Sequence, residues 1–414
     1  MKNMKKLFCF ALAVVMLLSV MAGCAAKTEQ GSSTTQASES TASTETASNE
    51  SADASDAAAT DGEIDIAFIG NTTGDYAQYG IPVRNAVMLY FDQLNAAGGI
   101  NGYPIEFHWQ DDEHDTEKSV NAYNALKDWG MNILVGTVTS TPCVAVANET
   151  AADNMFQLTP SGSATECVAN PNVFRVCFSD PNQGTASAQY IGENKLANKV
   201  AVIYNSSDVY SSGIYQKFAE EAKNQDFEVV SAEAFTEDSK TDFSVQLQKA
   251  KDAGADMVFL PIYYTEASLI LTQANSMGYA PTFFGCDGLD GLLAVKNFDT
   301  KLADGVMLLT PFAADADDEK TQAFVSAYKE AYGDTPNQFA ADTYDAIYIM
   351  KAAAEKAGVT ADMSVSDICD AMKTAMTEIS YDGLTGEGMT WTADGEPDKA
   401  PKAVVIKDGA YVAM

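Results

Sequence analysis

Apolar positions along the chain fall into two spacings, and the first is a short continuous run. Residues 64–70 form such a run closed by glycine, residues 133–136 repeat the pattern, and residues 257–260 form an apolar run followed by proline. Short apolar runs bounded by polar or glycine-rich loops are typical of buried strands. Strands are expected at residues 64–70, 105–109, 133–136, 155–158, 174–178, 200–204, 227–230, 257–260, 282–285, 306–309 and 403–406.

The second spacing places apolar residues three or four positions apart, which is typical of a helix with one buried face. Val83, Val87 and Tyr90 follow it after the first strand. We expect Pro82 to open this helix, because proline is favoured in a first turn, and residues 71–79 to form a polar loop before it. Similar patterns predict further helices near residues 122–129, 213–223, 247, 266–277, 321–332 and 339–357.

Strands and helices alternate, and this order predicts parallel sheets covered by helices on both faces. The alternation pauses after residues 174–178 and restarts at residues 200–204. About 350 residues follow the first 62, which are described below, and this is more than one hydrophobic core usually supports. The predicted fold class is therefore α/β, with two doubly wound parallel-sheet lobes.

The first 62 residues lie outside this pattern. An apolar run at residues 7–20 follows three lysines and has the length of a signal-peptide core. Small residues lead to Cys24, and residues 25–62 have too little aliphatic bulk to fold. We expect a lipoprotein signal peptide at residues 1–24, lipidation of Cys24, and a flexible, disordered tether at residues 25–62. The alternative is an ordinary signal peptide in which Cys24 is incidental.

Charge and hydropathy restrict the partners. The formal net charge is −33, from 25 basic and 58 acidic residues, which argues against nucleic acid and anionic lipid as partners. No later segment reaches about 18 uninterrupted apolar residues, so membrane contact is expected only through the lipid anchor. The predicted location is extracytoplasmic, anchored to the cell membrane.

Cysteine and histidine are too scattered to predict a metal site. No C-x-x-C pair follows the leader, and the chain has only two histidines, which argues against bound zinc. Cys167 and Cys177 flank a Pro-Asn turn and could form a disulfide in an oxidising compartment. Five buried free thiols are the alternative. The acidic run at residues 111–115 is interpreted as a solvated loop.

The sequence also lacks the usual catalytic motifs. No Gly-x-Ser-x-Gly surrounds Ser161 or Ser163, and both histidines, His108 and His114, lie near the second strand. A serine–histidine pair is therefore not expected. No phosphate-binding loop or dinucleotide glycine motif is present. We expect neither enzyme activity nor a cofactor.

Loops after the strands are the expected ligand site, because open parallel sheets bind ligands at the carboxyl ends of their strands. These loops are rich in hydroxyls and tyrosines, and Asp287 is their main acid. The only arginines, Arg84 and Arg175, lie in a predicted helix and a predicted strand. A ligand carboxylate would then have to be held by hydroxyls and backbone N–H groups. Neutral donors, one acid and tyrosines together suit a zwitterion.

Several motifs together resemble the periplasmic-binding-protein type I family, specifically the branched-chain amino-acid substrate-binding proteins of ABC transporters. The Gly-Gly-Ile-Asn-Gly turn at residues 98–102 is the most specific of them. The others are Thr73-Gly74, Ala77-Gln78-Tyr79-Gly80, Leu158-Thr159-Pro160-Ser161-Gly162-Ser163, Asp208-Val209-Tyr210, Cys286-Asp287-Gly288 and Tyr344-Asp345-Ala346. The resemblance covers residues 63–414.

The resemblance implies two lobes that close on a ligand about a three-strand hinge. Lobe 1 would comprise residues 63–180 and 312–380, and lobe 2 residues 181–311 and 381–414. The chain would cross between the lobes at residues 179–183, 310–313 and 381–385.

The resemblance also implies where a ligand would be held. Ser140, Ser161 and Ser163 would hold its carboxylate, and Asp287 would meet its ammonium group. Relatives commonly have Ala and Thr at the last two serine positions, and many have Glu in place of Asp287. Aromatic walls would come from Tyr79, Tyr210, Tyr264 (or Tyr263) and Phe339.

The function implied is that of a solute-binding lipoprotein. The protein, expected to be a monomer, would capture a small amino acid, branched-chain or similarly apolar, and deliver it to the permease of an ABC importer. One alternative is a ligand-sensing subunit of the same fold that signals to a membrane receptor. Another is a protein that binds an amide or a small aromatic acid.

Overall fold

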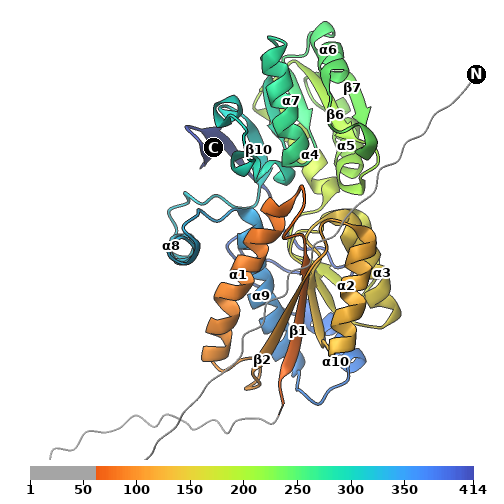
Figure 1. Ribbon diagram of the computed structural model, residues 1–414, viewed down its shortest axis with the longest axis vertical. Helices are drawn as coiled ribbons and strands as arrows, with labels where there is room; N and C mark the ends of the chain where they lie inside the picture. Colours follow the sequence, from red (N-terminus) through yellow and green to blue (C-terminus); the bar gives the residue numbers. More distant parts are fainter. Residues whose placement is uncertain (1–61) are drawn as a thin grey trace, which may run out of the picture. The chain divides into compact units, whose positions relative to one another are not determined.

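The computed structural model describes residues 62–414. The predictions for the signal peptide, for Cys24 and for nearly all of the tether lie outside this part of the chain. Residues 62–414 contain two β-sheets, each accompanied by helices (Figure 1). The predicted α/β class with two doubly wound lobes is confirmed.

The first sheet has the strand order β2-β1-β3-β4-β5, and every neighbouring pair is parallel. The strands are β1 (Ile64–Gly70), β2 (Ile105–Asp111), β3 (Ile133–Gly136), β4 (Gln157–Thr159) and β5 (Val173–Arg175). The helices of this lobe are α1 (Ala77–Ala96), α2 (Thr116–Trp129), α3 (Ser140–Ala152), η1 (Thr165–Val168), α8 (Glu319–Tyr332), α9 (Gln338–Ala357) and α10 (Val365–Met376).

Helices cover both faces of this sheet. Alternate residues of β1 belong to two separate buried clusters: Ile66 and Phe68 pack with residues of α1 and α9, whereas Ala67 and Ile69 pack with residues of α2 and α3. A strand that is buried on both faces has no polar alternation, which explains the continuous apolar run in the sequence.

The second sheet has the strand order β12-β11-β10-β9-β8-β6-β7. Its strands are β6 (Lys199–Asn205), β7 (Glu228–Phe235), β8 (Met257–Leu260), β9 (Thr282–Gly285), β10 (Met307–Thr310), β11 (Lys402–Lys407) and β12 (Ala410–Ala413). Strands β6 to β10 pair in parallel, whereas β11 and β12 form an antiparallel hairpin on β10. The accompanying helices are α4 (Asp180–Glu193), α5 (Val209–Glu221), η2 (Ala222–Asn224), η3 (Glu237–Ser239), α6 (Ser244–Asp252), α7 (Tyr264–Ser276), η4 (Asp287–Leu289), η5 (Leu292–Ala294) and η6 (Thr300–Ala303).

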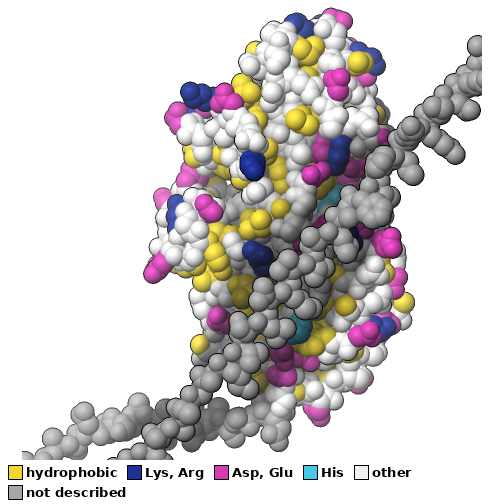
Figure 2. Space-filling view, in the orientation of Figure 1, with side chains coloured by type: hydrophobic (Ala, Val, Ile, Leu, Met, Phe, Trp, Pro, Cys, Tyr) yellow, Lys and Arg dark blue, Asp and Glu magenta, His cyan; other side chains and the backbone are white. Residues whose placement is uncertain are grey.

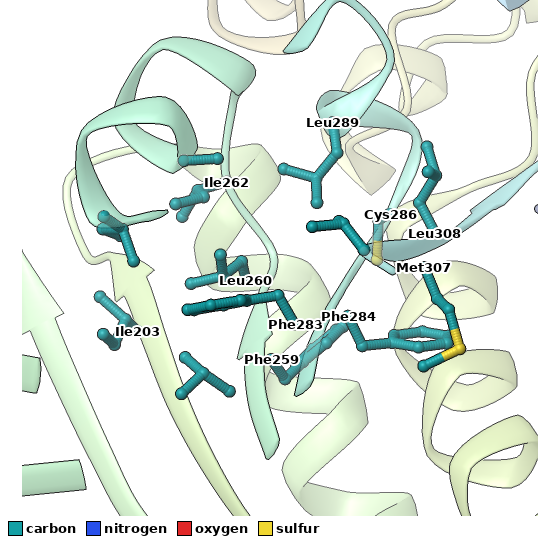
Figure 3. Packing of buried hydrophobic residues seen from close by; sticks show 14 of the residues in the cluster. Ile203, Phe259, Leu260, Ile262, Phe283, Phe284, Cys286, Leu289, Met307 and Leu308 are labelled. Atoms are coloured by element: carbon teal, nitrogen blue, oxygen red, sulfur yellow. The ribbon is translucent and has the colours of Figure 1, made fainter. Parts of the chain in front are cut away.

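Each sheet has its own core. Neighbouring strands of the second sheet bring Ile203, Phe259, Phe284 and Leu308 into one buried cluster (Figure 3). The main cluster of the first lobe forms around Phe68 and is separate. Two cores are the expected solution for a folded chain of this length.

Helix α1 begins at Ala77, so the prediction that Pro82 opens it is wrong. Proline leaves the carbonyl four residues earlier without its usual helical partner, and here the side-chain amide of Asn337 donates to that carbonyl, on Gln78, at 3.3 Å. A Cβ at Gly80 would lie 2.1 Å from the carbonyl oxygen of Asn71. Glycine therefore lets the first turns of α1 pack tightly against the end of β1.

The third crossing between the lobes differs from the sequence-based boundary at residue 381. Leu384 and Trp391 pack in the first-lobe cluster, and the Trp391 indole N–H donates to the carbonyl of Arg175 at 2.8 Å. The chain joins the second sheet only at β11. The assignment of residues 381–399 to lobe 2, and a crossing at residues 381–385, are corrected accordingly, because these side chains bury apolar surface against the first core.

All five cysteines of residues 62–414 are buried free thiols, so the open alternative of a Cys167–Cys177 disulfide is not realised. Within the same residues no helix is both long enough and apolar enough to cross a membrane. Figure 2 shows carboxylates scattered over the visible face, with basic side chains standing mostly singly.

Candidate ligand-binding site

Strand order places the candidate site. In the first sheet β1 lies between β2 and β3, and in the second β6 lies between β7 and β8. At these positions the strand order changes direction. The loops that follow the two neighbouring strands leave the sheet toward opposite faces and open a crevice at the carboxyl ends of the strands. The loops after β3 and β8 belong to these crevices and line the same small cavity, through Val138 and Tyr263.

This cavity has a volume of about 10 Å³ and is lined by both lobes. Its lining residues are Tyr79, Val138, Thr139, Ser140, Ser161, Ser163, Tyr210, Tyr263, Asp287, Gly288 and Phe339. Seven of the eight ligand-contact residues expected from the sequence are among them. The eighth, Tyr264, does not line the cavity, whereas its neighbour Tyr263, the stated alternative, does.

Serine hydroxyls form one wall. Ser140 is the first residue of α3, and its Oγ accepts the backbone N–H groups of Ser163 and Ala164, each at 3.2 Å. The Ser161 hydroxyl donates to the carbonyl of Val138 at 2.6 Å. These bonds join the loops after β3 and β4. Hydroxyls at the amino-terminal end of a helix suit a carboxylate, which the helix dipole and free N–H groups stabilise.

Arg175 supports this wall from outside the cavity. Its fully buried guanidinium donates to the carbonyls of Gly162 at 3.1 Å and Ala164 at 2.9 Å and pairs with Glu396 at 3.1 Å. The predicted position of Arg175 in a strand is confirmed by β5. Its support of the serine loop was not visible in the sequence, because the contact depends on how β5 pairs beside β4.

The opposite wall carries the acid. Asp287 is 4% exposed, and its carboxylate accepts the Tyr210 hydroxyl at 2.7 Å and the Gln183 amide at 3.0 Å. Burial raises the pKa of Asp287 to about 7, although both hydrogen bonds lower it. A Cβ at Gly288 would lie 2.6 Å from the Tyr210 hydroxyl, so glycine is needed beside this pair. The two hydrogen-bond donors are neutral, so neither compensates the charge of the carboxylate with a positive one.

Aromatic rings close the remaining sides. The Tyr79 and Phe339 ring centroids are 4.5 Å apart, and the Tyr210 and Tyr263 rings stack at 4.8 Å. Within residues 62–414 the buried Tyr263 hydroxyl has no hydrogen-bond partner. Buried polar groups are nearly always paired, so this hydroxyl is a candidate ligand contact that the sequence offered only as an alternative.

Direct contacts join the two lobes at the rim of the cavity. The Tyr264 hydroxyl accepts the N–H of Gln78 and donates to the carbonyl of Asp75, both at 3.0 Å. The Tyr76 hydroxyl donates to Glu266 at 2.7 Å, and the Lys240 ammonium donates to the same hydroxyl at 3.1 Å. Tyr264 therefore contributes to contact between the lobes instead of lining the cavity.

The loop at residues 111–115 agrees with its prediction at Glu113 and Asp115, which are exposed, but not at Asp112. Asp112 is fully buried and accepts the N–H of His114 at 3.0 Å, so it is not a solvated residue. The His114 ring packs edge-on against Tyr76 at 4.7 Å, and its Nδ1 lies 2.7 Å from the Thr139 hydroxyl. Burial lowers the pKa of His114 to about 4. The loop therefore supports the rim of the cavity.

Two α/β lobes that meet at a cavity with hydroxyls on one side and a carboxylate on the other define a two-lobed solute-binding protein. The sequence profile of the family described as periplasmic binding protein matches residues 63–410, and the chain belongs to this family.

Individual relatives are consistent with the profile. The chain is 28% identical over 297 residues, 71% of its length and 79% of the relative, to the leucine-, isoleucine-, valine-, threonine-, and alanine-binding protein of Pseudomonas aeruginosa. It is similar to the branched-chain amino acid transporter substrate binding protein LivJ of Streptococcus pneumoniae, solved with isoleucine, with a TM-score of 0.77 and 27% identity over 85% of this chain and 98% of that one. A solute binding protein of R. palustris solved with benzoate shares the fold, with a TM-score of 0.75 and 21% identity over 85% of this chain and 96% of that one.

Proposed function

We propose that the chain is an extracytoplasmic solute-binding protein that captures a small apolar amino acid and delivers it to an ABC importer. Relatives named for leucine, isoleucine and valine support the ligand class. The protein would bind and release its ligand without chemical turnover, as a periplasmic binding protein does.

The observation that carries the proposal is the placement of opposite chemistries on the two walls. Ser140 and Ser163 belong to the first lobe, and Asp287 and Tyr263 belong to the second. An amino acid would place its carboxylate at the serines and the amino-terminal end of α3, and its ammonium at Asp287. A ligand that touches both lobes stabilises their closed arrangement, because the open arrangement offers only half of these contacts.

Entry of the ligand requires the lobes to part. A cavity of about 10 Å³ has room for about one water molecule. The rim contacts of Tyr76 and Tyr264 must open to admit an amino acid and then form again around it. Such a movement is a hinge closure, absorbed at the crossings between the lobes.

Calorimetric titration of the mature protein tests the ligand class. Isoleucine should bind, isoleucinamide should bind more weakly because it lacks the anion, and benzoate should not bind because it lacks the ammonium. Asp287→Asn should lower the affinity for isoleucine by about tenfold or more, the usual effect of losing a hydrogen bond to a charged group. Tight binding of benzoate that Asp287→Asn leaves unchanged would identify an aromatic-acid binder instead.

The affinity should also depend on pH, with a definite sign. Binding of an ammonium requires ionised Asp287, and burial raises the pKa of this carboxyl to about 7 while the lobes are in contact and no ligand is bound. Isoleucine affinity should therefore fall as the pH drops below about 7, by up to about tenfold per pH unit. Asp287→Asn should lose most of this pH dependence.

Anchoring by lipid on Cys24 is part of the same proposal and rests on the sequence of residues 1–62. Cys24→Ala should release the protein into the medium or leave it unprocessed, as cell fractionation and mass spectrometry of its amino terminus would detect. A variant that is still membrane-bound and normally cleaved would contradict the anchor.

A further inference from the structure

A second cavity, of about 650 Å³, lies beside the one around Asp287 and is far larger. The first lobe contributes Pro82 of α1 and Tyr328 of α8, and the second contributes Leu293 of η5 and Tyr411 of β12. Figure 1 shows α8 and the carboxyl-terminal hairpin on the same side of the molecule. A volume in the range of about 300–1,000 Å³ is typical of small-molecule sites.

The two cavities share walls. In three elements, residues close together in the sequence face different cavities, so each element separates one cavity from the other. These pairs, with the residue of the smaller cavity first, are Tyr79 and Pro82 of α1, Asp287 and Asp290 of the η4 segment, and Phe339 and Asn337 at the start of α9.

The lining of the larger cavity combines apolar surface with an excess of negative charge. Asp290, Asp315 and Asp334 line it, and Lys329 is the one cationic side chain in the lining. Apolar surface comes from Ile81, Pro82, Leu293, Leu308, Phe312 and Val404. A small molecule with a positive charge at one end and an apolar body complements both properties.

Asp290 is the best-placed acid. It is 6% exposed, and its Oδ2 accepts the backbone N–H of Gln338 at 2.9 Å. Within residues 62–414 this is the only hydrogen bond of the Asp290 side chain. A buried carboxylate that receives only a neutral donor gains strongly from a cation, because little water screens the pair.

We propose that this larger cavity is a second ligand site, which binds a small organic cation with an apolar body, such as an arylalkylamine. The ammonium group pairs with Asp290, and the apolar body lies between Pro82 of one lobe and Leu293 of the other. Because the occupant touches both lobes, it stabilises their closed arrangement. It therefore raises the affinity for the amino acid, a consequence that rests on the proposed function.

Phenethylamine and its neutral analogue 2-phenylethanol test the site. In calorimetric titrations of the mature wild-type protein, phenethylamine should bind at least about tenfold more tightly than 2-phenylethanol, because only the amine can pair with Asp290. Asp290→Asn keeps an acceptor for the Gln338 N–H and should remove this difference. Asp287→Asn, which changes the smaller cavity, should leave phenethylamine binding unchanged.

A second variant guards against a folding defect in Asp290→Asn. Ala410 is exposed on the carboxyl-terminal hairpin and lines the larger cavity. Ala410→Trp should fill part of the cavity and lower the affinity for phenethylamine without changing thermal stability. The proposal is overturned if phenethylamine fails to bind wild type. It is also overturned if both variants bind the amine as wild type does, or if Asp287→Asn rather than Asp290→Asn abolishes binding.

Isoleucine titrations with and without saturating phenethylamine test the coupling. Isoleucine affinity should increase severalfold, and phenethylamine affinity should increase by the same factor in the presence of isoleucine. Unchanged isoleucine affinity would overturn the coupling. If isoleucine does not bind at all, the proposed function fails, whereas an Asp290-dependent amine site stands on its own result.

Discussion

At the scale of single residues, the adjacent tyrosines Tyr263 and Tyr264 have different environments. The buried Tyr263 hydroxyl has no partner within residues 62–414, whereas the Tyr264 hydroxyl joins the lobes through Gln78 and Asp75. Tyr263→Phe should leave the stability of the free protein unchanged or raise it, because an unpaired buried hydroxyl costs free energy. It should nevertheless weaken isoleucine binding by about tenfold, the effect of losing one hydrogen bond to a charged group of the ligand.

Tyr264→Phe is the matched control. It removes two hydrogen bonds between the lobes but no group that lines the cavity. It should speed ligand dissociation, as stopped-flow fluorescence would measure, and leave discrimination between isoleucine and isoleucinamide unchanged. Equal affinities of wild type and Tyr263→Phe for isoleucine would remove the Tyr263 hydroxyl from the site.

At the scale of elements, three segments meet through Tyr76 before α1, Glu266 in the first turn of α7 and Lys240 after η3. None of the three lines the small cavity, so their effect on a ligand can only come through closure. Tyr76→Phe removes the hydroxyl that bridges the other two and should speed dissociation by about tenfold, since a bond to a charged group is lost only in the closed form. Tyr123→Phe loses a similar bond, to Asp153 at 2.7 Å, within one lobe. It should lower stability without changing the dissociation rate, and an equal acceleration in both variants would contradict the closure role.

The same scale shows what the sequence could and could not predict. Strands β1, β3, β8 and β9 have their predicted bounds. Each is an apolar run buried on both faces, and such a run can be recognised in the sequence without knowing which strands pair with it. Helix starts were less predictable: the contact of the Gln78 carbonyl with Asn337 allows α1 to run through Pro82. Helix α3 was missed because its small residues give little apolar contrast.

The candidate site was predictable to the same degree. Seven of the eight residues that the family resemblance implied line one cavity. The choice between Tyr263 and Tyr264 depends on whether α7 starts at Tyr264 or later, which the sequence did not determine. The role of Arg175 depends on how β5 pairs beside β4, and the larger cavity depends on contacts between segments far apart in the chain.

At the scale of the whole molecule, burial of acids makes folding depend on pH. Burial raises the pKa of six carboxyl groups to about 6 or 7. They are Asp112, Asp208, Glu266, Asp287, Asp290 and Asp342. Each is protonated in the folded protein at a pH where its unfolded counterpart, with a pKa near 4, is already charged. His114, with its pKa lowered to about 4, acts in the opposite direction but is a single group.

The folded protein therefore binds more protons than the unfolded chain between about pH 4 and pH 7, and its stability should fall as the pH rises through this window. One net proton corresponds to about 1.4 kcal/mol per pH unit.

Urea unfolding of the ligand-free protein should give a larger free energy of unfolding near pH 5 than near pH 7. Asp287→Asn should reduce this difference, because it removes one of the six groups. Asp318→Asn should not, because the pKa of Asp318 is lowered and lies below the window. Greater stability near pH 7 than near pH 5 would show that these carboxyl groups are ionised in the folded protein, and that the acid in the small cavity is already charged before a ligand arrives.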